Sequence, residues 1–353
     1  MNNTIHNYLK QCIEEEIFPG CVVGTVIKGQ QEVIAAGHCT YDATSRKVSE
    51  NTVYDVASIT KAVPTSCLAL KLIEEGRLTL SSRLIDFVPE FSGTFRDQVR
   101  VEHLMTHTLE FDFRLSDKKE LPPREILGSI LKARLRTPPG TAFCYANATS
   151  ILLGLVVERV SGMRLDNAAG HYFFGPLGMR STTFFPETID CSYIAPAEDD
   201  VWRGRVICGE VHDESAWALR PVIIAGSAGL FSTVPDVLKF LDMLLKKGCA
   251  VDGQRIFSPE TIRLMSTNLL PPELGCRAAP GWELCQPDFM GNHCTASTFG
   301  KTGFTGCAIV ADPPRAAGFV LLTNHTFPRR REDRSLINKV RSALAEMVFG
   351  RSG

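Results

Sequence analysis

The chain has 353 residues, of which 44% are hydrophobic and 22% charged, and its formal net charge is −1. This length and composition are ordinary for a globular protein with one large domain or two closely joined domains. The near-zero net charge argues against a nucleic-acid partner, because binding to the phosphate backbone requires a surplus of basic residues.

The N-terminal segment, residues 1–6, has neither the basic start nor the apolar core of a signal peptide. No stretch of the sequence approaches the roughly 20 apolar residues that a membrane-spanning helix needs. We therefore expect a cytoplasmic protein without a membrane partner, in which the 12 cysteines stay reduced.

The two ends of the chain carry matching patterns of strand and helix. An amphipathic helix is expected over residues 3–17, followed by a hairpin of β-branched runs at 21–27 and 32–36. Near the C-terminus, two similar runs flank a turn within 307–323, and a last helix is expected over 332–349. Because each hairpin lies beside a helix, we predict one antiparallel sheet that is built from both chain ends and covered by the terminal helices.

The middle of the chain is predicted to be mostly helical. One helix is expected to begin at Ser58, to bend slightly near Pro64 and to end at Gly76, a residue typical of helix C-termini. Two more apolar helices are expected over 149–160 and 235–247. No repeat or linker separates these helices from the rest of the chain.

The predicted fold class is therefore α+β, an antiparallel sheet flanked by terminal helices with an all-helical insertion. Residues 1–57 and 270–353 are expected to form a discontinuous sheet domain. Residues 58–269 are expected to form the mostly helical domain.

A run of arginines and a set of evenly spaced cysteines could suggest binding sites, but we interpret both as structural. Residues 329–331 are three arginines, which we interpret as the solvated start of the last helix. Cys276, Cys285 and Cys294 are evenly spaced and His293 adjoins the last of them, but the short paired spacing of zinc sites is missing. We interpret these cysteines as free buried thiols and predict neither a metal nor a cofactor.

A short motif at the start of the first central helix indicates a nucleophile. Ser58 and Lys61 are three residues apart, so they would share one helical face. A serine hydroxyl becomes a good nucleophile when a neighbouring base takes its proton, and a desolvated lysine can act as that base. The pattern alone is weak, because it recurs at Ser116 and Ser129 and because a lone serine at this position more often caps a helix.

Two further motifs follow in an order that strengthens the first. Tyr145-Ala146-Asn147 is expected on the loop before the second central helix, and loops often carry catalytic groups. Lys301-Thr302-Gly303 is expected on an edge strand, where the surrounding glycines would let a substrate approach the backbone. Each triplet alone would be an ordinary loop or hairpin entry. Together, in this order, the three motifs predict a serine acyl-transfer site.

With these motifs the sequence resembles the class C β-lactamase family of serine hydrolases. That family includes penicillin-binding D-alanyl-D-alanine peptidases, family VIII carboxylesterases and related acyltransferases. The similarity includes residues 53–57, 101–108, 178–182 and 225–233 and extends over about residues 5 to 350. It implies a β-lactamase/transpeptidase-like fold with the active site in the cleft between the sheet domain and the helical domain.

The resemblance also implies a role for each motif residue. Ser58 would be the acylated nucleophile, Lys61 its proton-handling partner, and Tyr145 a general base and then acid. The backbone N–H groups of Ser58 and Phe304 would stabilise the oxyanion. The residues expected to bind or orient the substrate are Asn147, Lys301, Thr302 and Gly303. From the residues themselves, neutral Lys61 is as acceptable a base as an ionised Tyr145.

Departures from the family pattern bear on the substrate. The residue after Lys-Thr-Gly is the bulky Phe304, His107 is followed two residues later by Leu109-Glu110, and no Ser-Asp-Asn motif is present. We therefore expect a carboxylesterase acting on a small-molecule ester or amide first, a D-amino-acid peptidase or amidase second, and a weak β-lactamase third. The alternatives are an acyltransferase that uses the same serine and a catalytically silent ligand-binding homologue. No oligomeric state is predicted.

Overall fold

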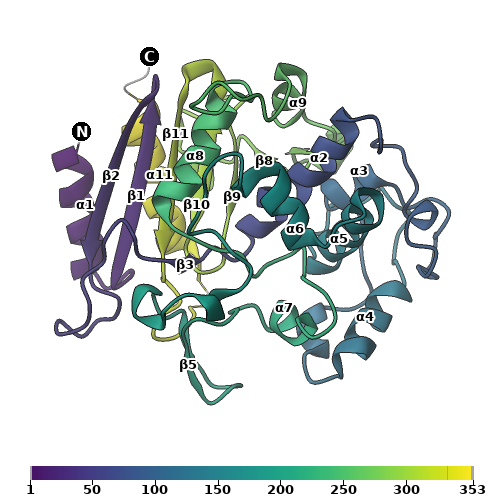
Figure 1. Ribbon diagram of the computed structural model, residues 1–353, viewed down its shortest axis with the longest axis horizontal. Coiled ribbons are helices and arrows are strands. Elements are labelled where there is room, and N and C mark those ends of the chain that lie inside the picture. Colours follow the sequence, from purple (N-terminus) through teal and green to yellow (C-terminus); the bar gives the residue numbers. More distant parts are fainter. Residues whose placement is uncertain (1, 332, 351–353) are drawn as a thin grey trace.

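A seven-stranded antiparallel sheet forms the centre of the computed structural model, which describes residues 2–331 and 333–350 (Figure 1). The strand order is β2-β1-β11-β10-β9-β8-β7. The strands are β1 (Gly20–Ile27), β2 (Gln30–Gly37), β7 (Ala278–Ala279), β8 (Trp282–Leu284), β9 (Phe299–Thr302), β10 (Ala308–Asp312) and β11 (Ala317–Thr323). The N-terminal hairpin pairs with the C-terminal strand β11, which confirms the predicted sheet built from both chain ends.

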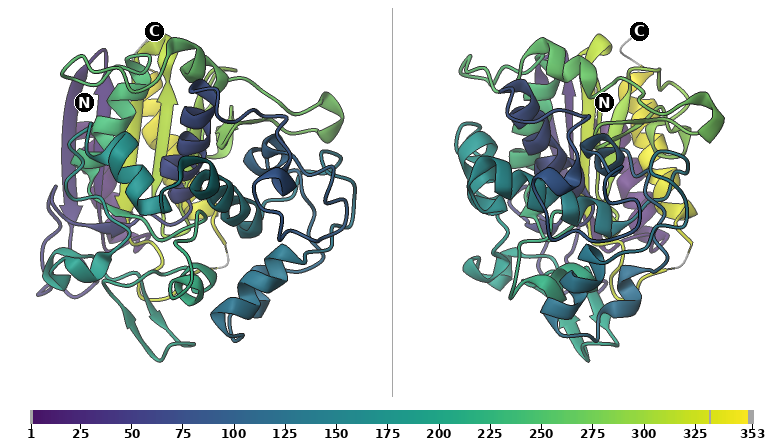
Figure 2. Two further views of the ribbon diagram at one scale, coloured as in Figure 1. Left: turned by 45° about the vertical axis from the view of Figure 1, so that its right-hand side comes forward. Right: turned by 90° about the vertical axis from the view of Figure 1, so that its right-hand side faces the viewer.

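Helices cover both faces of the sheet. Helices α1 (Asn2–Glu14), α10 (Pro287–Met290) and α11 (Ser335–Phe349) cover one face, and α8 (Val234–Leu245) covers the other (Figure 2). Strand side chains alternate between the faces. Cys21 and Val23 therefore pack under α1 and α11, whereas Val22 and Val26 belong to the core that includes α8.

Most of the remaining helices lie together beside the sheet (Figure 1). They are α2 (Cys67–Glu74), α3 (Val101–Met105), α4 (Pro123–Leu131), α5 (Asn147–Ser161), α6 (Leu165–Ala169), α7 (Glu214–Leu219) and α9 (Pro259–Leu264). Two small sheets, β3 (Tyr54–Asp55) with β6 (Phe231–Ser232) and β4 (Glu198–Asp200) with β5 (Arg205–Ile207), complete the fold. The domain division at residues 58 and 270 stays a prediction. Helix α8 belongs to the segment expected to be the helical domain, yet it packs on strands β1, β10 and β11 of the sheet.

The first central helix differs from its prediction. A wide π-helical segment, Lys61–Ser66, follows Ser58, and the regular helix α2 begins only at Cys67. Val63 within this segment is extended, with φ −112° and ψ 106°. The ring of Pro64 excludes the helical conformation at the preceding residue and removes one backbone donor, so it interrupts the helix instead of bending it slightly.

Two other predictions concern segments near the C-terminus. The last helix, α11, begins at Ser335, and the predicted start at Glu332 lies outside the described residues. Strand β9 is not an edge strand, because β8 pairs with it at Gly300 and Phe299. The pairing with β8 stops at Gly300, and among the described residues no strand pairs with β9 at Lys301 and Thr302 on that side.

Among the described helices, none is long and apolar enough to cross a membrane.

Candidate active site

Ser58 follows a strained turn that is held by a buried carboxylate. Ala57, directly before it, has a positive φ of 47°, a conformation that costs energy for a residue with a side chain. Asp55 Oδ1 accepts the Ala57 N–H at 2.8 Å, and Asp55 Oδ2 accepts the His212 N–H at 2.8 Å. Asp55 therefore links the turn that presents Ser58 to the segment before α7.

Lys61 lies directly beside the Ser58 hydroxyl. Its Nζ is 3.0 Å from Ser58 Oγ and donates to the Ser227 carbonyl oxygen at 2.8 Å. The Lys61 side chain is buried, although the helix that carries it is irregular. The three-residue spacing thus brings the lysine to the serine as the sequence predicts.

Tyr145 completes the group around Ser58. The Lys61 and Lys301 ammonium groups lie 5.1 Å and 4.7 Å from the centroid of its ring. Tyr145 is 46% exposed, and desolvation by its neighbours opposes ionisation of the phenol, but the charges of Lys61 and Lys301 and the adjacent Ser58 hydroxyl lower the pKa of Tyr145 overall. The phenol is therefore a better proton acceptor than an ordinary tyrosine.

His107 packs against the Tyr145 ring, with the ring centroids 4.6 Å apart. Burial, together with the charges of Lys301 and Lys61, holds the pKa of His107 well below its usual value. His107 is therefore neutral near pH 7 and adds no third cation beside the phenol. Thr149 Oγ1 lies 2.8 Å from His107 Nδ1 and fixes the ring.

Lys301 reaches the site from β9 and pairs with a carboxylate on β8. Its Nζ is 2.8 Å from Glu283 Oε1, and its side chain is buried. Burial lowers the pKa of Lys301, but Glu283 and the neighbouring Tyr145 oxygen outweigh this and raise it overall. Lys301 is thus a permanent positive charge next to Tyr145.

Gly303 accommodates the backbone of the nucleophile segment. A Cβ at this position would overlap the Val56 carbonyl oxygen and lie 3.4 Å from the Ala57 Cβ. Gly303 also lines the cleft, so the expectation that the motif glycines admit a substrate stays a prediction. The absence of a side chain lets the Lys-Thr-Gly strand lie directly against the Ser58 turn, and Thr305 Oγ1 ties the two together by donating to the Asp55 carbonyl at 2.8 Å.

We expect Gly303→Ala to lower the free energy of unfolding by about 1–3 kcal/mol, because the added methyl group must displace backbone. Gly128→Ala is a matched control, since Gly128 lies inside α4 and an added Cβ meets nothing within 4 Å. That control should be neutral or gain up to about 1 kcal/mol from helix propensity. Urea denaturation measures both, and equal stabilities of the two variants would contradict the close approach at Gly303.

Asn147, the first residue of α5, is held by two residues at the N-terminus of α7. Its Nδ2 donates to Asp213 Oδ2 at 3.0 Å and to Ser215 Oγ at 3.3 Å. Burial opposes ionisation of Asp213, but hydrogen bonds with Ser215 and the charge of Lys61 lower its pKa. A fixed Asp213 carboxylate therefore sets the orientation of the Asn147 amide toward the cleft.

The backbone N–H groups of Ser58 and Phe304 are available to a ligand. Within residues 2–331 and 333–350, neither N–H donates a hydrogen bond to another protein group. The Phe304 ring is fixed between the His212 ring, stacked at 5.8 Å, and the Arg334 guanidinium at 4.8 Å. Two fixed, unpartnered N–H groups beside a serine can stabilise negative charge on an acyl oxygen.

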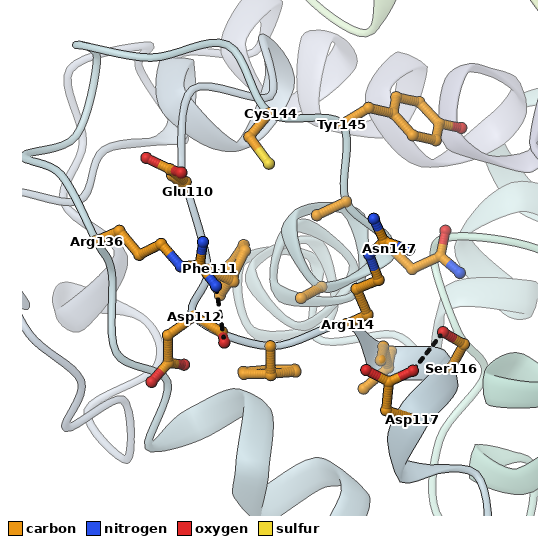
Figure 3. A pocket seen from close by; sticks show the side chains of 14 residues that line it. Glu110, Phe111, Asp112, Arg114, Ser116, Asp117, Arg136, Cys144, Tyr145 and Asn147 are labelled. Carbon is orange, nitrogen blue, oxygen red and sulfur yellow. Dashed lines mark hydrogen bonds between the residues drawn. The ribbon is translucent and has the colours of Figure 1, made fainter.

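These groups line a cleft of about 650 Å³ that includes Ser58, Tyr145, Asn147, Thr302, Gly303 and Phe304. Tyr145 and Asn147 also line a second hollow of about 700 Å³ (Figure 3). Residues 110–117 form much of its wall, which is where the sequence departs from the family pattern after His107. Tyr145 and Asn147 thus line two spaces that a substrate can occupy.

The arginine run 329–331 precedes α11, which begins at Ser335, so it is not a helix start, although Arg329 and Arg331 are exposed as predicted. Arg330 donates to both Glu198 oxygens at 2.8 Å and to Glu214 at 2.8 Å, beside the cleft. Arg331 donates to the Glu16 carbonyl at 2.8 Å. The carboxylates come from distant segments, so the run alone did not indicate these contacts.

The three evenly spaced cysteines are only partly buried, contrary to the prediction. Cys285 Sγ and Cys294 Sγ lie 3.5 Å apart, and Cys276 lies at the cleft. In the described part of the chain, no group of three or more His, Cys, Asp or Glu side chains is arranged to hold a metal ion.

The structure thus brings together all eight residues predicted for the site. It adds residues to which the sequence assigned no role, among them Asp55 and His107, which lie in stretches already noted as family-like, and His212, Asp213 and Glu283. Only Asp213 had a local signal, because an aspartate before a helix typically caps it, and its Oδ1 accepts the Ala216 N–H at 2.8 Å. The roles of all these residues are proposals.

Comparisons with known proteins show the family and the fold of the chain. A family model described as Beta-lactamase matches residues 5–342. A protein of Escherichia coli (strain K12), named as a D-alanyl-D-alanine carboxypeptidase, is 29% identical over 314 residues, which cover 79% of this chain and 70% of that protein.

Two solved structures are similar over nearly the whole chain. EstCE1, described as a hydrolase with promiscuous acyltransferase activity, has a TM-score of 0.76 at 22% identity, covering 96% of this chain and 98% of that one. An octameric penicillin-binding protein homologue from Pyrococcus abyssi has a TM-score of 0.77 at 23% identity, covering 98% and 76%. These similarities confirm the predicted β-lactamase/transpeptidase-like fold.

Proposed function

Because this chain belongs to the Beta-lactamase family, whose fold carries serine hydrolases, we propose that it forms an acyl-enzyme on Ser58 and acts on a small-molecule ester or amide. The observation that carries the proposal is the arrangement around Ser58 Oγ. Lys61 Nζ lies 3.0 Å from it, Tyr145 with its lowered pKa lines the same cleft, and the backbone N–H groups of Ser58 and Phe304, also in that lining, have no partner among the described residues.

In the proposed reaction, the Tyr145 phenolate accepts the Ser58 proton while Ser58 Oγ attacks the substrate carbonyl carbon. The carbonyl oxygen becomes an oxyanion, which the N–H groups of Ser58 and Phe304 stabilise. Tyr145 then donates the proton to the leaving group, and an acyl-enzyme remains. Water, deprotonated by the same phenolate, then attacks the acyl carbon. The bond from that carbon to Ser58 Oγ breaks, Tyr145 returns the proton to Oγ, and the carboxylic acid product leaves.

We propose a carboxylesterase activity before an amidase or D-amino-acid peptidase activity, and a β-lactamase activity last. The bulky Phe304 at the cleft supports this order, since it narrows the space beside the Lys-Thr-Gly strand. The similarity to a named carboxypeptidase supports the second place for a peptidase. Asn147 and the second hollow would receive the acyl side chain.

Steady-state rates on p-nitrophenyl acetate, p-nitrophenyl butyrate and nitrocefin test this order. We expect kcat/KM to be higher for either ester than for nitrocefin. A higher value for nitrocefin would reverse the proposed order of substrates, while retaining Ser58 as the nucleophile.

Acyl transfer is a second candidate, because two hollows meet at Tyr145 and together can hold an acyl group and an acceptor. The similar fold of EstCE1, a hydrolase with promiscuous acyltransferase activity, supports testing it. Added alcohols or amines should then yield transfer products by mass spectrometry. Their absence, with hydrolysis intact, would leave water as the acceptor.

A further inference from the structure

Arg341 on α11 donates hydrogen bonds to a single turn of the backbone. Its side chain is buried, with 3% exposure. Its guanidinium donates to the carbonyl oxygens of Gly303 at 2.9 Å, Gly306 at 3.2 Å and Cys307 at 3.1 Å. A further bond, at 2.7 Å, goes to Asn338 Oδ1. All three carbonyls belong to the turn between β9 and β10, which carries Phe304.

One of these bonds acts on the peptide that contains the Phe304 N–H. The Gly303 carbonyl and the Phe304 N–H belong to the same trans peptide unit, in which C=O and N–H point in opposite directions. A donor that fixes the carbonyl therefore fixes the direction of the N–H. A positive charge at the carbonyl oxygen also polarises the peptide and makes its N–H a stronger donor.

Burying the charged guanidinium of Arg341 costs free energy unless hydrogen-bond acceptors compensate for the lost water. Within the described residues, no carboxylate lies within 4.0 Å of the guanidinium, so main-chain carbonyls and the Asn338 amide are its compensation. Burial lowers the pKa of Arg341 to about 10, and the group is still cationic at neutral pH. A full positive charge is thus maintained at the turn that carries Phe304.

We propose that Arg341, which lines the cleft with only 3% of its surface exposed, is a positioning residue of the oxyanion hole that orients and polarises the Phe304 N–H through the Gly303 carbonyl. The inference rests on the proposed function, because it requires an acyl oxygen at the Phe304 N–H. It also predicts that Arg341 acts on substrates that carry no charge.

Arg341→Lys tests the inference with p-nitrophenyl acetate, a neutral ester. The ammonium keeps the charge but cannot satisfy three carbonyls at once, so we expect kcat to fall about 10–100-fold, less than or comparable to the loss of an oxyanion donor. KM should change by less than about threefold, because the N–H interaction is strongest in the transition state. Lys339→Met, which removes an exposed cation from the same helix, should leave both constants unchanged.

An equilibrium measurement separates this role from a general loss of structure. Phenylboronic acid forms a tetrahedral adduct with a catalytic serine, and its Ki should rise in Arg341→Lys by a factor similar to the fall in kcat/KM. Wild-type kcat in a folded Arg341→Lys, or a change confined to KM, would overturn the inference.

Two further outcomes are distinguishable. If Arg341→Lys does not fold, Asn338→Ala replaces it as the test. That variant removes one guanidinium partner and should lower kcat severalfold, and an unchanged kcat would refute the inference. If the wild-type protein neither hydrolyses the ester nor reacts at Ser58, the proposed function itself fails.

Discussion

Ser58→Ala is expected to lower kcat/KM for p-nitrophenyl acetate by about 10⁴-fold or more, as the loss of a catalytic nucleophile does in other serine hydrolases. The effect is chemical and not structural, because Lys61 keeps its bond to the Ser227 carbonyl and, among the described residues, Ser58 Oγ makes no hydrogen bond to the backbone. Thermal denaturation of the variant should therefore resemble that of the wild type.

Ser129→Ala is the matched control for this prediction. Ser129 and Lys132 repeat the Ser-x-x-Lys spacing, but Ser129 Oγ donates to the Glu125 carbonyl within α4. The control should retain full activity. Comparable losses in both variants would mean that the activity does not depend on a nucleophile at Ser58.

Tyr145→Phe is expected to lower turnover by about 10²–10⁴-fold, the usual contribution of general acid–base catalysis. The ring packing on His107 is retained, so stability should change little. Tyr193→Phe is the control, because Tyr193 is likewise exposed, at 56%, but lines neither hollow. Near-wild-type activity of Tyr145→Phe on both an ester and an amide would make the tyrosine structural and leave the proton transfer to Lys61.

The pH dependence follows from the lowered pKa of Tyr145. The phenolate is the proton acceptor, so wild-type kcat/KM should rise with pH through an apparent pKa below the ordinary value of about 10. Lys301→Met removes one of the two cations that lower this pKa, so the rising limb should move to higher pH. If the rising limb of the pH profile of kcat/KM does not move, Lys301 does not set the ionisation of Tyr145.

The parts of the site that the sequence predicted are those with local spacing. Ser58 and Lys61 meet because residues three apart in a helical turn are neighbours, even though Pro64 disrupts the helix beyond them. The sheet from both chain ends was also predictable, since each hairpin has β-branched runs around a turn.

The parts that the sequence did not predict depend on contacts between distant segments. Asp55 holds Ala57 and His212, which is far along the chain, and no spacing indicates that pairing. The buried position of Arg341 has the same origin, because its three acceptor carbonyls lie in a turn more than 30 residues earlier. Gly303 was recognised as part of a motif, but its need to pack on Val56 is visible only in three dimensions.

Intact mass spectrometry after incubation with a fluorophosphonate probe tests the central claim most directly. A serine activated by Lys61 and Tyr145 should react once, and peptide mapping should place the adduct on Ser58. Ser58→Ala should remain unlabelled under the same conditions. An unlabelled wild-type protein that binds ligands without turnover would indicate a catalytically silent homologue, and a label that persists in Ser58→Ala would contradict the assignment of the nucleophile.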